Sequence, residues 1–186
     1  MPDYLSSNTR YASRPARPDE AATVRALWRE FIAEQIAGGY CENDWELPDV
    51  IDAFDARLEA AVECGWVALL IERASGSAVG FLAGLAHEAD ARIPPDALLI
   101  TDLYLQPAHR LGATGLPLWP CIREQAAAAG KSRLVCSTHE RNRLMLLVLG
   151  RLGFAPAPPL PFEVSGHSWW QLMLEGSSSV SGEAGA

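Results

Sequence analysis

The residues best suited to chemistry in this sequence form a turn between an apolar strand and a helix. Residues 103–109 read Leu-Tyr-Leu-Gln-Pro-Ala-His, and Arg110-Leu111-Gly112-Ala113-Thr114-Gly115-Leu116 follow before a helix-forming run that ends at Gly130. A strand that leads through a tight turn into a helix gathers unpaired backbone N–H groups at the positive end of the helix dipole. Such a place binds phosphate, so we expect the amides of residues 111–116 to face a phosphate group.

A second segment downstream adds to this pattern. Residues 133–137 are predicted to form a strand that leads into a helix at residues 140–152, with Asn142 near its start and Gly153-Phe154 beyond its end. Together the two segments resemble the acetyl-CoA site of the GNAT superfamily of N-acetyltransferases, whose pattern is Arg-x-x-Gly-x-Gly/Ala followed by an Asn, a helix and a Gly-Phe. The first motif falls on Arg110, Ala113 and Gly115. Residues 14–21 look like the family's opening strand and first helix cap, so the resemblance covers residues 10–174.

The resemblance implies a fold and a cosubstrate. The fold is α/β (α+β mixed), a GNAT-like acyl-CoA N-acyltransferase fold with one central mixed, mostly antiparallel sheet flanked by helices. The cosubstrate is acetyl-CoA. In the family a β-bulge frees main-chain groups for the pantetheine arm, and by position these belong to Leu103, Tyr104 and Leu105. Arg110 would assist phosphate binding, and Asn142 would hydrogen-bond the cofactor or simply occupy a favourable first-turn position.

The sequence departs from the family pattern in three places. Ala113 replaces the first Gly of the motif, and Leu149 stands where many members have a Tyr that protonates the departing thiolate. Pro117 fits a first helical turn, whereas Pro120 is expected to kink the helix or delay its hydrogen bonding. The loss of the Tyr is tolerable because a thiol with a pKa of about 8.5 is an acceptable leaving group.

Acetyl transfer to an amine also needs a base, because a lysine-like amine has a pKa of about 10.4. Asp102 is the candidate, since Thr101-Asp102-Leu103-Tyr104-Leu105 resembles the Glu-Asp-Leu-Phe/Tyr-Val strand of diamine acetyltransferases, with Thr101 in place of the acidic residue. The alternative is a buried carboxylate that accepts backbone hydrogen bonds. His139 and Tyr104 are further candidates. Glu140 is expected to close a capping box with Ser137 rather than act as the base.

The acceptor amine is expected to bind at the loop between the first two helices. Tyr40, Glu42 and Trp45 mix aromatic and acidic side chains, which suit a cationic amine. The alternative is a solvated loop whose Trp45 folds onto the core. In the last strand, Trp169-Trp170 allow a homodimer contact, although one of the pair facing the core is the commoner arrangement.

Composition excludes several other classes of protein. A net charge of −8 over 186 residues argues against nucleic-acid binding, which needs a basic surface. The four cysteines, at positions 41, 64, 121 and 136, have no metal-ligand spacing, so neither a metal nor a disulfide is expected. Residues 1–10 are polar and no apolar stretch reaches membrane-spanning length, which predicts a cytoplasmic protein with no membrane partner.

The elements that would position these residues alternate along the chain. Residues 1–9 are expected to be flexible, residues 10–174 to form one N-acetyltransferase domain, and residues 175–186 to be a mobile Gly/Ser/Ala tail. Strands are predicted at residues 10–14, 66–72, 78–85, 97–105, 133–137 and 168–174, and helices at residues 19–36, 49–63, 140–152 and between Gly115 and Gly130. The first helix is expected to be capped by Asp19 and to bury Ala22, Leu27, Phe31 and Ile32.

Three functions fit this sequence. The first is an acetyl-CoA-dependent N-acetyltransferase that moves an acetyl group directly, in a ternary complex, to a small cationic amine or an exposed protein amine. The second is a non-catalytic acyl-CoA-binding module that has lost its general acid at Leu149. The third is an α/β interaction protein without a cofactor, which acetyl-CoA would not stabilise against unfolding.

Overall fold

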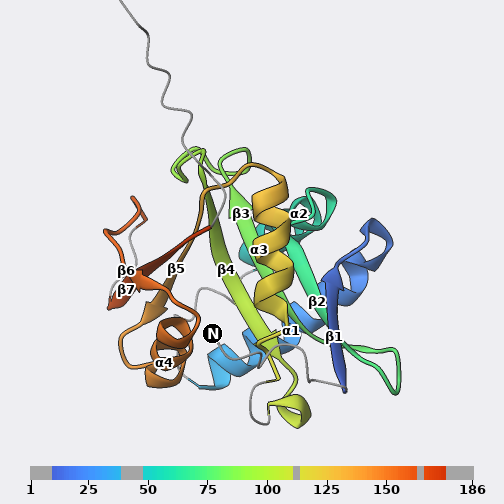
Figure 1. Cartoon of the computed structure of the whole chain (residues 1–186). Coiled ribbons are helices and arrows are strands. Elements are labelled where there is room, and N and C mark those ends of the chain that lie inside the picture. Colours follow the sequence, from blue (N-terminus) through green and yellow to red (C-terminus); the bar gives the residue numbers. More distant parts are fainter. Residues whose placement is uncertain (1–9, 39–47, 111–113, 163–165, 175–186) are drawn as a thin grey trace, which may run out of the picture.

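The computed structural model describes residues 10–38, 48–110, 114–162 and 166–174. Within these ranges the chain forms one mixed sheet of seven strands with helices on both faces (Figure 1). The strands are β1 (Tyr11–Pro15), β2 (Val67–Glu72), β3 (Ala78–Ala86), β4 (Ala97–Leu105), β5 (Arg133–His139), β6 (Ala155–Pro156) and β7 (His167–Met173). The helices are α1 (Ala21–Ala37), α2 (Pro48–Glu63), α3 (Leu118–Ala128) and α4 (Arg143–Arg151), with 3-10 turns η1 (Pro18–Glu20) and η3 (Pro107–His109).

The sheet is antiparallel except at its centre. Its strand order is β1-β2-β3-β4-β5-β7-β6, and only the β4–β5 pair is parallel. A parallel pair needs a crossover connection, and α3 supplies it between these two strands. The structure therefore confirms the mixed, mostly antiparallel sheet that the sequence predicts.

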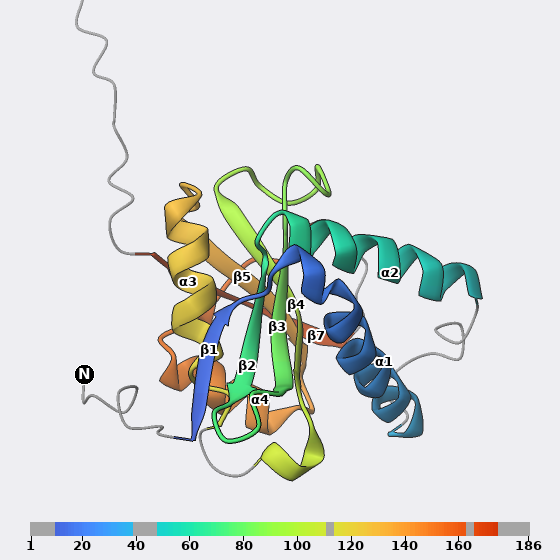
Figure 2. The same ribbon diagram turned by 90° about the vertical axis from the view of Figure 1, so that its right-hand side faces the viewer.

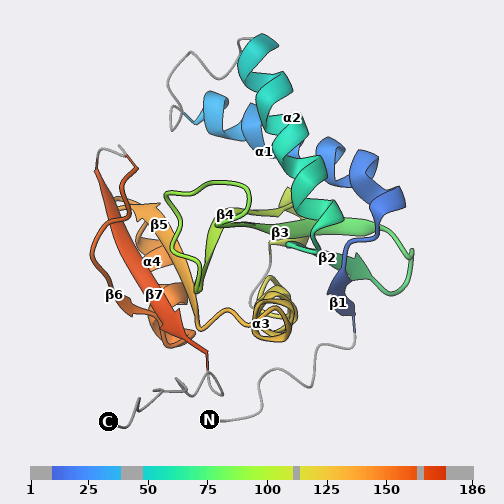
Figure 3. The same ribbon diagram turned by 90° about the horizontal axis from the view of Figure 1, so that it is seen from above.

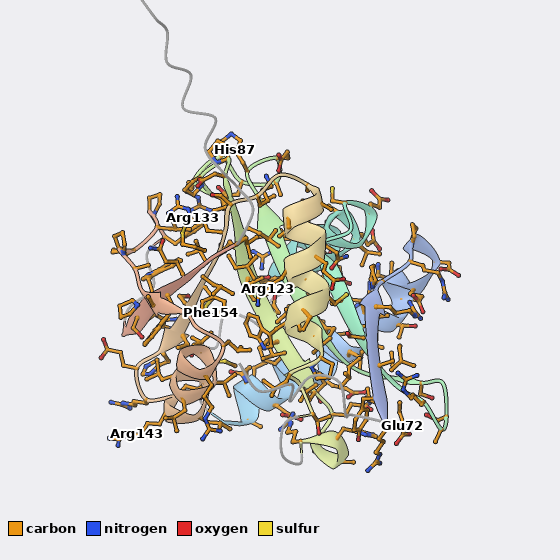
Figure 4. All side chains as sticks on the ribbon, in the orientation of Figure 1. Glu72, His87, Arg123, Arg133, Arg143 and Phe154 are labelled. Atoms are coloured by element: carbon orange, nitrogen blue, oxygen red, sulfur yellow. The ribbon has the colours of Figure 1, made fainter. Side chains whose placement is uncertain are left out.

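Each face of the sheet buries its own set of side chains. Alternation along β3 sends Phe81 and Ala83 to the face covered by α1 and α2, and Leu82 to the face covered by α3. Figures 2 and 3 show these helices on opposite sides of the sheet. On the α3 face, Phe154, which follows α4 and is labelled in Figure 4, packs edge-on against Trp119 of α3 with ring centroids 5.4 Å apart. Helix α4 is thereby joined to α3.

The predicted elements are confirmed, with differences at helix ends. Helix α1 follows the η1 turn, so Glu20 rather than Asp19 precedes its first residue. Ala22 is exposed, and Val24 and Trp28 are buried instead. Gly130, at φ +74°, follows α3 in the left-handed conformation that favours glycine. The two-residue strand β6 lies in the Pro-rich connection, where the sequence gives no strand signal. Among the described helices, none is long and apolar enough to cross a bilayer.

Candidate functional site

The two parallel strands at the centre of the sheet separate partway along their length. Pairing between β4 and β5 covers only Ala97–Ile100 and Arg133–Cys136. Beyond these residues β4 continues to Leu105 and β5 to His139, and Figure 1 shows the strands diverging toward α4. The sheet therefore opens at its centre, and we call this place the β4–β5 opening.

A β-bulge marks the start of the opening. Ala83 of β3 pairs with Asp102 and Gly84 pairs with Ile100, so Thr101 is the extra residue on β4. A bulge bends its strand and increases its twist, which carries the rest of β4 away from β5. The bulge thus lies two residues before Leu103, the first residue whose main-chain groups the resemblance expects a bulge to free.

The opening leaves main-chain groups of β4 facing away from β3. The Gln106 amide donates to the Val79 carbonyl at 2.9 Å, so these residues form a hydrogen-bonded pair of the antiparallel ladder. Alternation then directs the backbone of Tyr104 toward β3, and the backbones of Leu103 and Leu105 toward the opening. Leu103 and Leu105 therefore face the opening, whereas the amide and carbonyl of Tyr104 point away from it, so the main-chain contact predicted for Tyr104 does not fit this geometry.

Arg110 holds the end of β4. Its Nε donates to the Leu105 carbonyl at 2.7 Å, and its Nη2 pairs with Glu34 of α1 at 2.5 Å. The same guanidinium lies over the Tyr104 ring, 5.3 Å from its centroid. Arg110 was predicted to assist phosphate binding, and its observed partners are a carboxylate and a carbonyl of its own chain.

The Tyr104 side chain lies beneath α1. Its hydroxyl donates to Glu34 at 3.1 Å and lies 3.2 Å from Glu30. Burial and these two carboxylates raise the pKa of Tyr104 above its ordinary value, because all three factors disfavour a phenolate. Tyr104 is therefore held as a neutral hydrogen-bond donor and does not fit the role of a base.

The turn before α3 is described from Thr114 onward. Leu111, Gly112 and Ala113, predicted to face phosphate, lie outside the described residues. Thr114 is buried, and Gly115 packs so close to Leu105 that an added Cβ would lie 3.2 Å from its side chain. The turn therefore lies directly beside the end of β4.

The start of α3 offers few amide donors of its own. Pro117 is its N-cap and Pro120 its third residue, so neither position has an N–H group. The amides of Leu118 and Trp119 donate to Gly115 and Leu116 carbonyls, each at 3.2 Å. The expected kink at Pro120 is not required, because a first-turn residue has no intrahelical acceptor to lose. A phosphate group would therefore have to bind to amides of the turn that precedes α3.

Helix α4 begins later than predicted. Its N-cap is Asn142, whose Oδ1 accepts from the Met145 amide at 3.1 Å. Ser137 lies within β5, so the predicted capping box of Ser137 and Glu140 is wrong. The cap uses only the oxygen of Asn142, and its predicted bond to a cofactor stays a prediction. Leu149 is 1% exposed in the α3-side core, which makes it a packing residue.

A cavity of about 590 Å³ lies on the other face, beside the bulge. Its floor includes Thr101 of β4, Ser137 of β5 and Trp169 of β7. The full lining comprises Arg57, Leu85, Asp90, Arg92, Leu99, Ile100, Thr101, Ser137, Pro161, Phe162 and Trp169. Because Arg57 belongs to α2, the cavity lies on the α1/α2 side of the sheet. Trp169 is buried here, which confirms the core placement for one residue of the tryptophan pair.

Asp102 lies next to this cavity but is not among the residues that line it. Asp102 is 7% exposed, and burial raises the pKa of its carboxyl, while the Thr101 hydroxyl, the charge of Arg57 and the Trp28 indole act in the opposite direction. A raised pKa suits a group that must accept a proton near neutral pH. The structure thus gives Asp102 a base-like environment without direct contact with the cavity.

Two histidines stand at the β5 side of the opening. The rings of His139 and His167 have centroids 5.6 Å apart, and His167 Nδ1 lies 3.4 Å from the Ser137 hydroxyl. Burial, together with His139, lowers the pKa of His167, which favours a neutral imidazole. His139, predicted as a further base candidate, accepts from the Arg141 amide through Nδ1.

Some predicted residues cannot be placed, and others were missed. Tyr40, Glu42 and Trp45, predicted to bind the acceptor, lie outside the described residues. Arg57, Asp90 and Arg92 line the cavity but carried no sequence signal, because a charged residue on an amphipathic helix or in a turn looks like ordinary surface. No group of three or more potential metal ligands occurs in the part of the chain that the structure describes.

No protein-family model and no curated protein matches the sequence. Solved structures do match. YncA from Salmonella typhimurium, solved with its cofactor acetyl-CoA, is 19% identical, with a TM-score of 0.68 over 91% of this chain and 97% of its own. The PaiA N-acetyltransferase from Thermoplasma acidophilum, in complex with coenzyme A, is 14% identical, with a TM-score of 0.64 over 88% of this chain and 98% of its own. A GNAT superfamily phosphinothricin acetyltransferase from Sinorhizobium meliloti, in complex with acetyl-CoA, is 15% identical, with a TM-score of 0.64 over 89% of each chain.

These likenesses extend over nearly the whole of each protein at low sequence identity. They confirm the fold class that the sequence predicts, a mixed sheet flanked by helices. The chain has the fold of the GNAT acetyltransferases.

Proposed function

We propose that the protein is an acetyl-CoA-dependent N-acetyltransferase that moves an acetyl group to a primary amine by direct transfer in a ternary complex. One observation carries this proposal. The β4–β5 opening, where the backbones of Leu103 and Leu105 have lost a strand partner, lies against a cavity on the α1/α2 face. A thioester at the opening and an amine in the cavity would meet at the bulge. The acetyl-CoA and coenzyme A bound by similar structures support the choice of cosubstrate.

The cofactor would bind through main-chain groups. Leu103 offers its amide and carbonyl, and Leu105 its amide, to the amide groups of a pantetheine arm, as a missing strand would, while the Leu105 carbonyl accepts from Arg110. The turn before α3 would meet the diphosphate, with Arg110 and Asn142 as side-chain contributors. The complete proposed set is Leu103, Leu105, Arg110, Leu111, Gly112, Ala113, Thr114, Gly115, Leu116 and Asn142. Gly112 and Gly115 have no side chains, which would suit a close approach of backbone and ligand.

The chemistry follows from the groups on the α1/α2 side. The amine must lose a proton, and Asp102 is the proposed base, reached through the Thr101 hydroxyl or a bridging water because Asp102 does not line the cavity. The nitrogen lone pair then forms a bond to the thioester carbonyl carbon, and an amide of the opening donates to the carbonyl oxygen as it gains charge. As the C–S bond breaks, the nitrogen loses its second proton to solvent and the thiolate takes a proton from solvent, since Leu149 cannot donate one.

Thiol release tests this function. The purified protein with acetyl-CoA and a panel of polyamines, amino acids, aminoglycosides and peptides should release free coenzyme A thiol only when an amine is present. A product whose mass exceeds that of the acceptor by one acetyl group should accompany the thiol. Silence across the whole panel, with acetyl-CoA shown to bind, would reject catalysis.

A non-catalytic acyl-CoA-binding module is the second candidate, favoured by the burial of Leu149 at the position of the family's general acid. Acetyl-CoA would then raise the melting temperature without turnover of any amine. If acetyl-CoA produces no thermal shift at all, both proposals fail and an interaction protein without a cofactor remains.

A further inference from the structure

Two arginines line the cavity on the α1/α2 side, and their surroundings differ. Arg92 pairs with Asp90 at 2.6 Å and lies over the Phe162 ring, 4.4 Å from its centroid. Arg57 lies over the Phe54 ring, also 4.4 Å from its centroid. Phe54 in turn stacks on Trp28 of α1, with centroids 5.1 Å apart. Both guanidinium groups are therefore held against aromatic rings, but only Arg92 has a carboxylate partner in the described ranges.

Three carboxylates in the neighbourhood of Arg57 are already paired with other arginines. On α2, Asp55 pairs with Arg29 and Arg25, and Glu59 pairs with Arg25. Asp90 pairs with Arg92. No described carboxylate forms an ion pair with Arg57, although Asp102 and Asp90 lie close enough for their charges to act on it.

An unpaired guanidinium in such a place is costly. Burial lowers the pKa of Arg57 because it disfavours the cation, yet a guanidinium stays charged at neutral pH. A partly buried charge without an ion-pair partner reduces stability, so such a site gains when an anion arrives. The aromatic contact fixes the plane of the guanidinium, which favours a two-bond contact with a carboxylate.

The rest of the cavity indicates what lies between the anion and the reacting nitrogen. Thr101 and Ser137 stand where β4 and β5 separate, beside the proposed position of the thioester. The lining also includes apolar side chains, those of Leu85, Leu99, Ile100, Phe162 and Trp169. A second cation, as in a polyamine, would be repelled by Arg57.

We infer that the acceptor is a small amine that carries a carboxylate, namely an amino acid with an apolar side chain, whose carboxylate pairs with Arg57. This inference rests on the proposed acetyl transfer and narrows its acceptor. The amine then lies toward Thr101 and Ser137, and the apolar side chain lies against Phe162 and Trp169. Arg57 acts as a specificity residue.

Matched pairs of acceptors test the inference. Leucine and phenylalanine are each compared with the corresponding amine that lacks the carboxylate, by thiol release from acetyl-CoA. Because a charged hydrogen bond contributes about 1.5–3 kcal/mol, the wild-type protein should favour each amino acid by about 10- to 100-fold in kcat/KM. Arg57→Gln should bring this ratio close to one, and Arg57→Lys should keep part of it.

Arg29→Gln is the control variant, because Arg29 of α1 is a nearby arginine that pairs with Asp55 of α2 and does not line the cavity. It should keep the wild-type ratio. A ratio near or below one in the wild-type protein, or an unchanged ratio in Arg57→Gln, would overturn the inference while leaving acetyl transfer intact.

A binding measurement separates this inference from the proposed function. With saturating coenzyme A, phenylalanine should raise the melting temperature of the wild-type protein and of Arg29→Gln, but not that of Arg57→Gln. If no acceptor releases thiol, acetyl transfer fails, and this thermal shift still decides whether the cavity recognises an amino acid. No shift in the wild-type protein would reject the recognition itself.

Discussion

The two sides of the β4–β5 opening differ in what they bury. The α3 side holds a core of Leu118, Trp119, Ile122, Leu149 and Phe154, and burial raises the pKa of its two thiols, Cys121 and Cys136, to about 11 and about 12. The α1/α2 side holds Asp102, Tyr104 and Arg57, each with a shifted pKa. Under the proposed mechanism, side-chain proton transfer would therefore take place on the α1/α2 side.

Under the proposed mechanism, this difference would place the two substrates on opposite sides. A cofactor bound on the α3 side would rely on main-chain groups and apolar contact, which need no titratable residue. An amine that must lose a proton would be served on the α1/α2 side. Variants that alter one side without the other test this division.

Asp102→Asn should have the largest effect. Loss of a general base typically lowers the rate by about 10²–10⁴-fold, so kcat for any accepted amine should fall by that factor. Because burial raises the pKa of Asp102, the folded state disfavours its charged form. Its contribution to stability is thus greatest below the unfolded pKa of about 3.9 and falls as the pH rises.

The neutral Asn avoids that loss, so Asp102→Asn should have a higher melting temperature than the wild-type protein at pH 7. Reduced activity together with raised stability would mark a residue kept for function. Unchanged kcat with a lower melting temperature would instead mark Asp102 as a structural carboxylate. The α1/α2 side would then have no proposed general base.

Leu149→Tyr tests the α3 side. This substitution restores the side chain that many family members use as a general acid, but Leu149 is 1% exposed. Overpacking of a core costs about 1–3 kcal/mol, so the free energy of unfolding should fall by that amount and kcat should not rise. Leu149→Met, which conserves volume, should cost less than about 1.5 kcal/mol. Faster turnover by the Tyr variant would show that proton donation operates on both sides.

Arg110 joins the two sides, because it pairs with Glu34 of α1 at the end of β4. If it contributes to phosphate binding, Arg110→Gln should weaken acetyl-CoA binding about 10-fold, as expected for a lost charged hydrogen bond. Glu34→Gln frees the guanidinium and should tighten binding by a smaller factor. Calorimetric titration measures both dissociation constants. Equal dissociation constants in the wild-type protein and both variants would show that Arg110 does not bind acetyl-CoA and serves only its contacts with Leu105 and Glu34.

Glu20 should show the smallest effect and serves as a contrast. Arg14 pairs with its carboxylate at 2.6 Å and, with the Arg17 amide, lowers the pKa of Glu20 to about 2. Its contribution to stability is present above the unfolded pKa of about 4.3 and is lost as the pH falls toward 2. Urea unfolding should show Glu20→Gln less stable by about 1 kcal/mol at pH 6, with a smaller gap at pH 2.5. A changed kcat would contradict its purely structural role.

The sequence predicted the sheet well because its strands have strong local signals. Residues 97–105 are a mostly apolar run and form β4 with the bounds that the sequence indicates. The first residues of the helices were predicted less accurately. Ser137 and Glu140 have the spacing of a capping box, but strand pairing with β7 extends β5 through His139, so tertiary contacts override the local signal.

The site was only partly predictable. The motif around Arg110 locates the turn, and Leu103 and Leu105 face the opening as the resemblance implies. The direction of the Tyr104 backbone and the position of the bulge depend on the register between β3 and β4, which no local pattern specifies. Arg57 has no local sequence signal, because its lack of an ion-pair partner depends on the tertiary pairing of Asp55 and Glu59 with Arg25.

Amide hydrogen exchange resolved by NMR tests the central claim most directly. The amides of Leu103 and Leu105 face the opening, whereas the amide of Tyr104, between them, faces β3. We predict that acetyl-CoA slows exchange at Leu103 and Leu105 by at least about 10-fold and leaves Tyr104 unchanged, as expected for new hydrogen bonds formed only at the opening. Unaltered exchange at Leu103 and Leu105 under saturating acetyl-CoA would contradict the account.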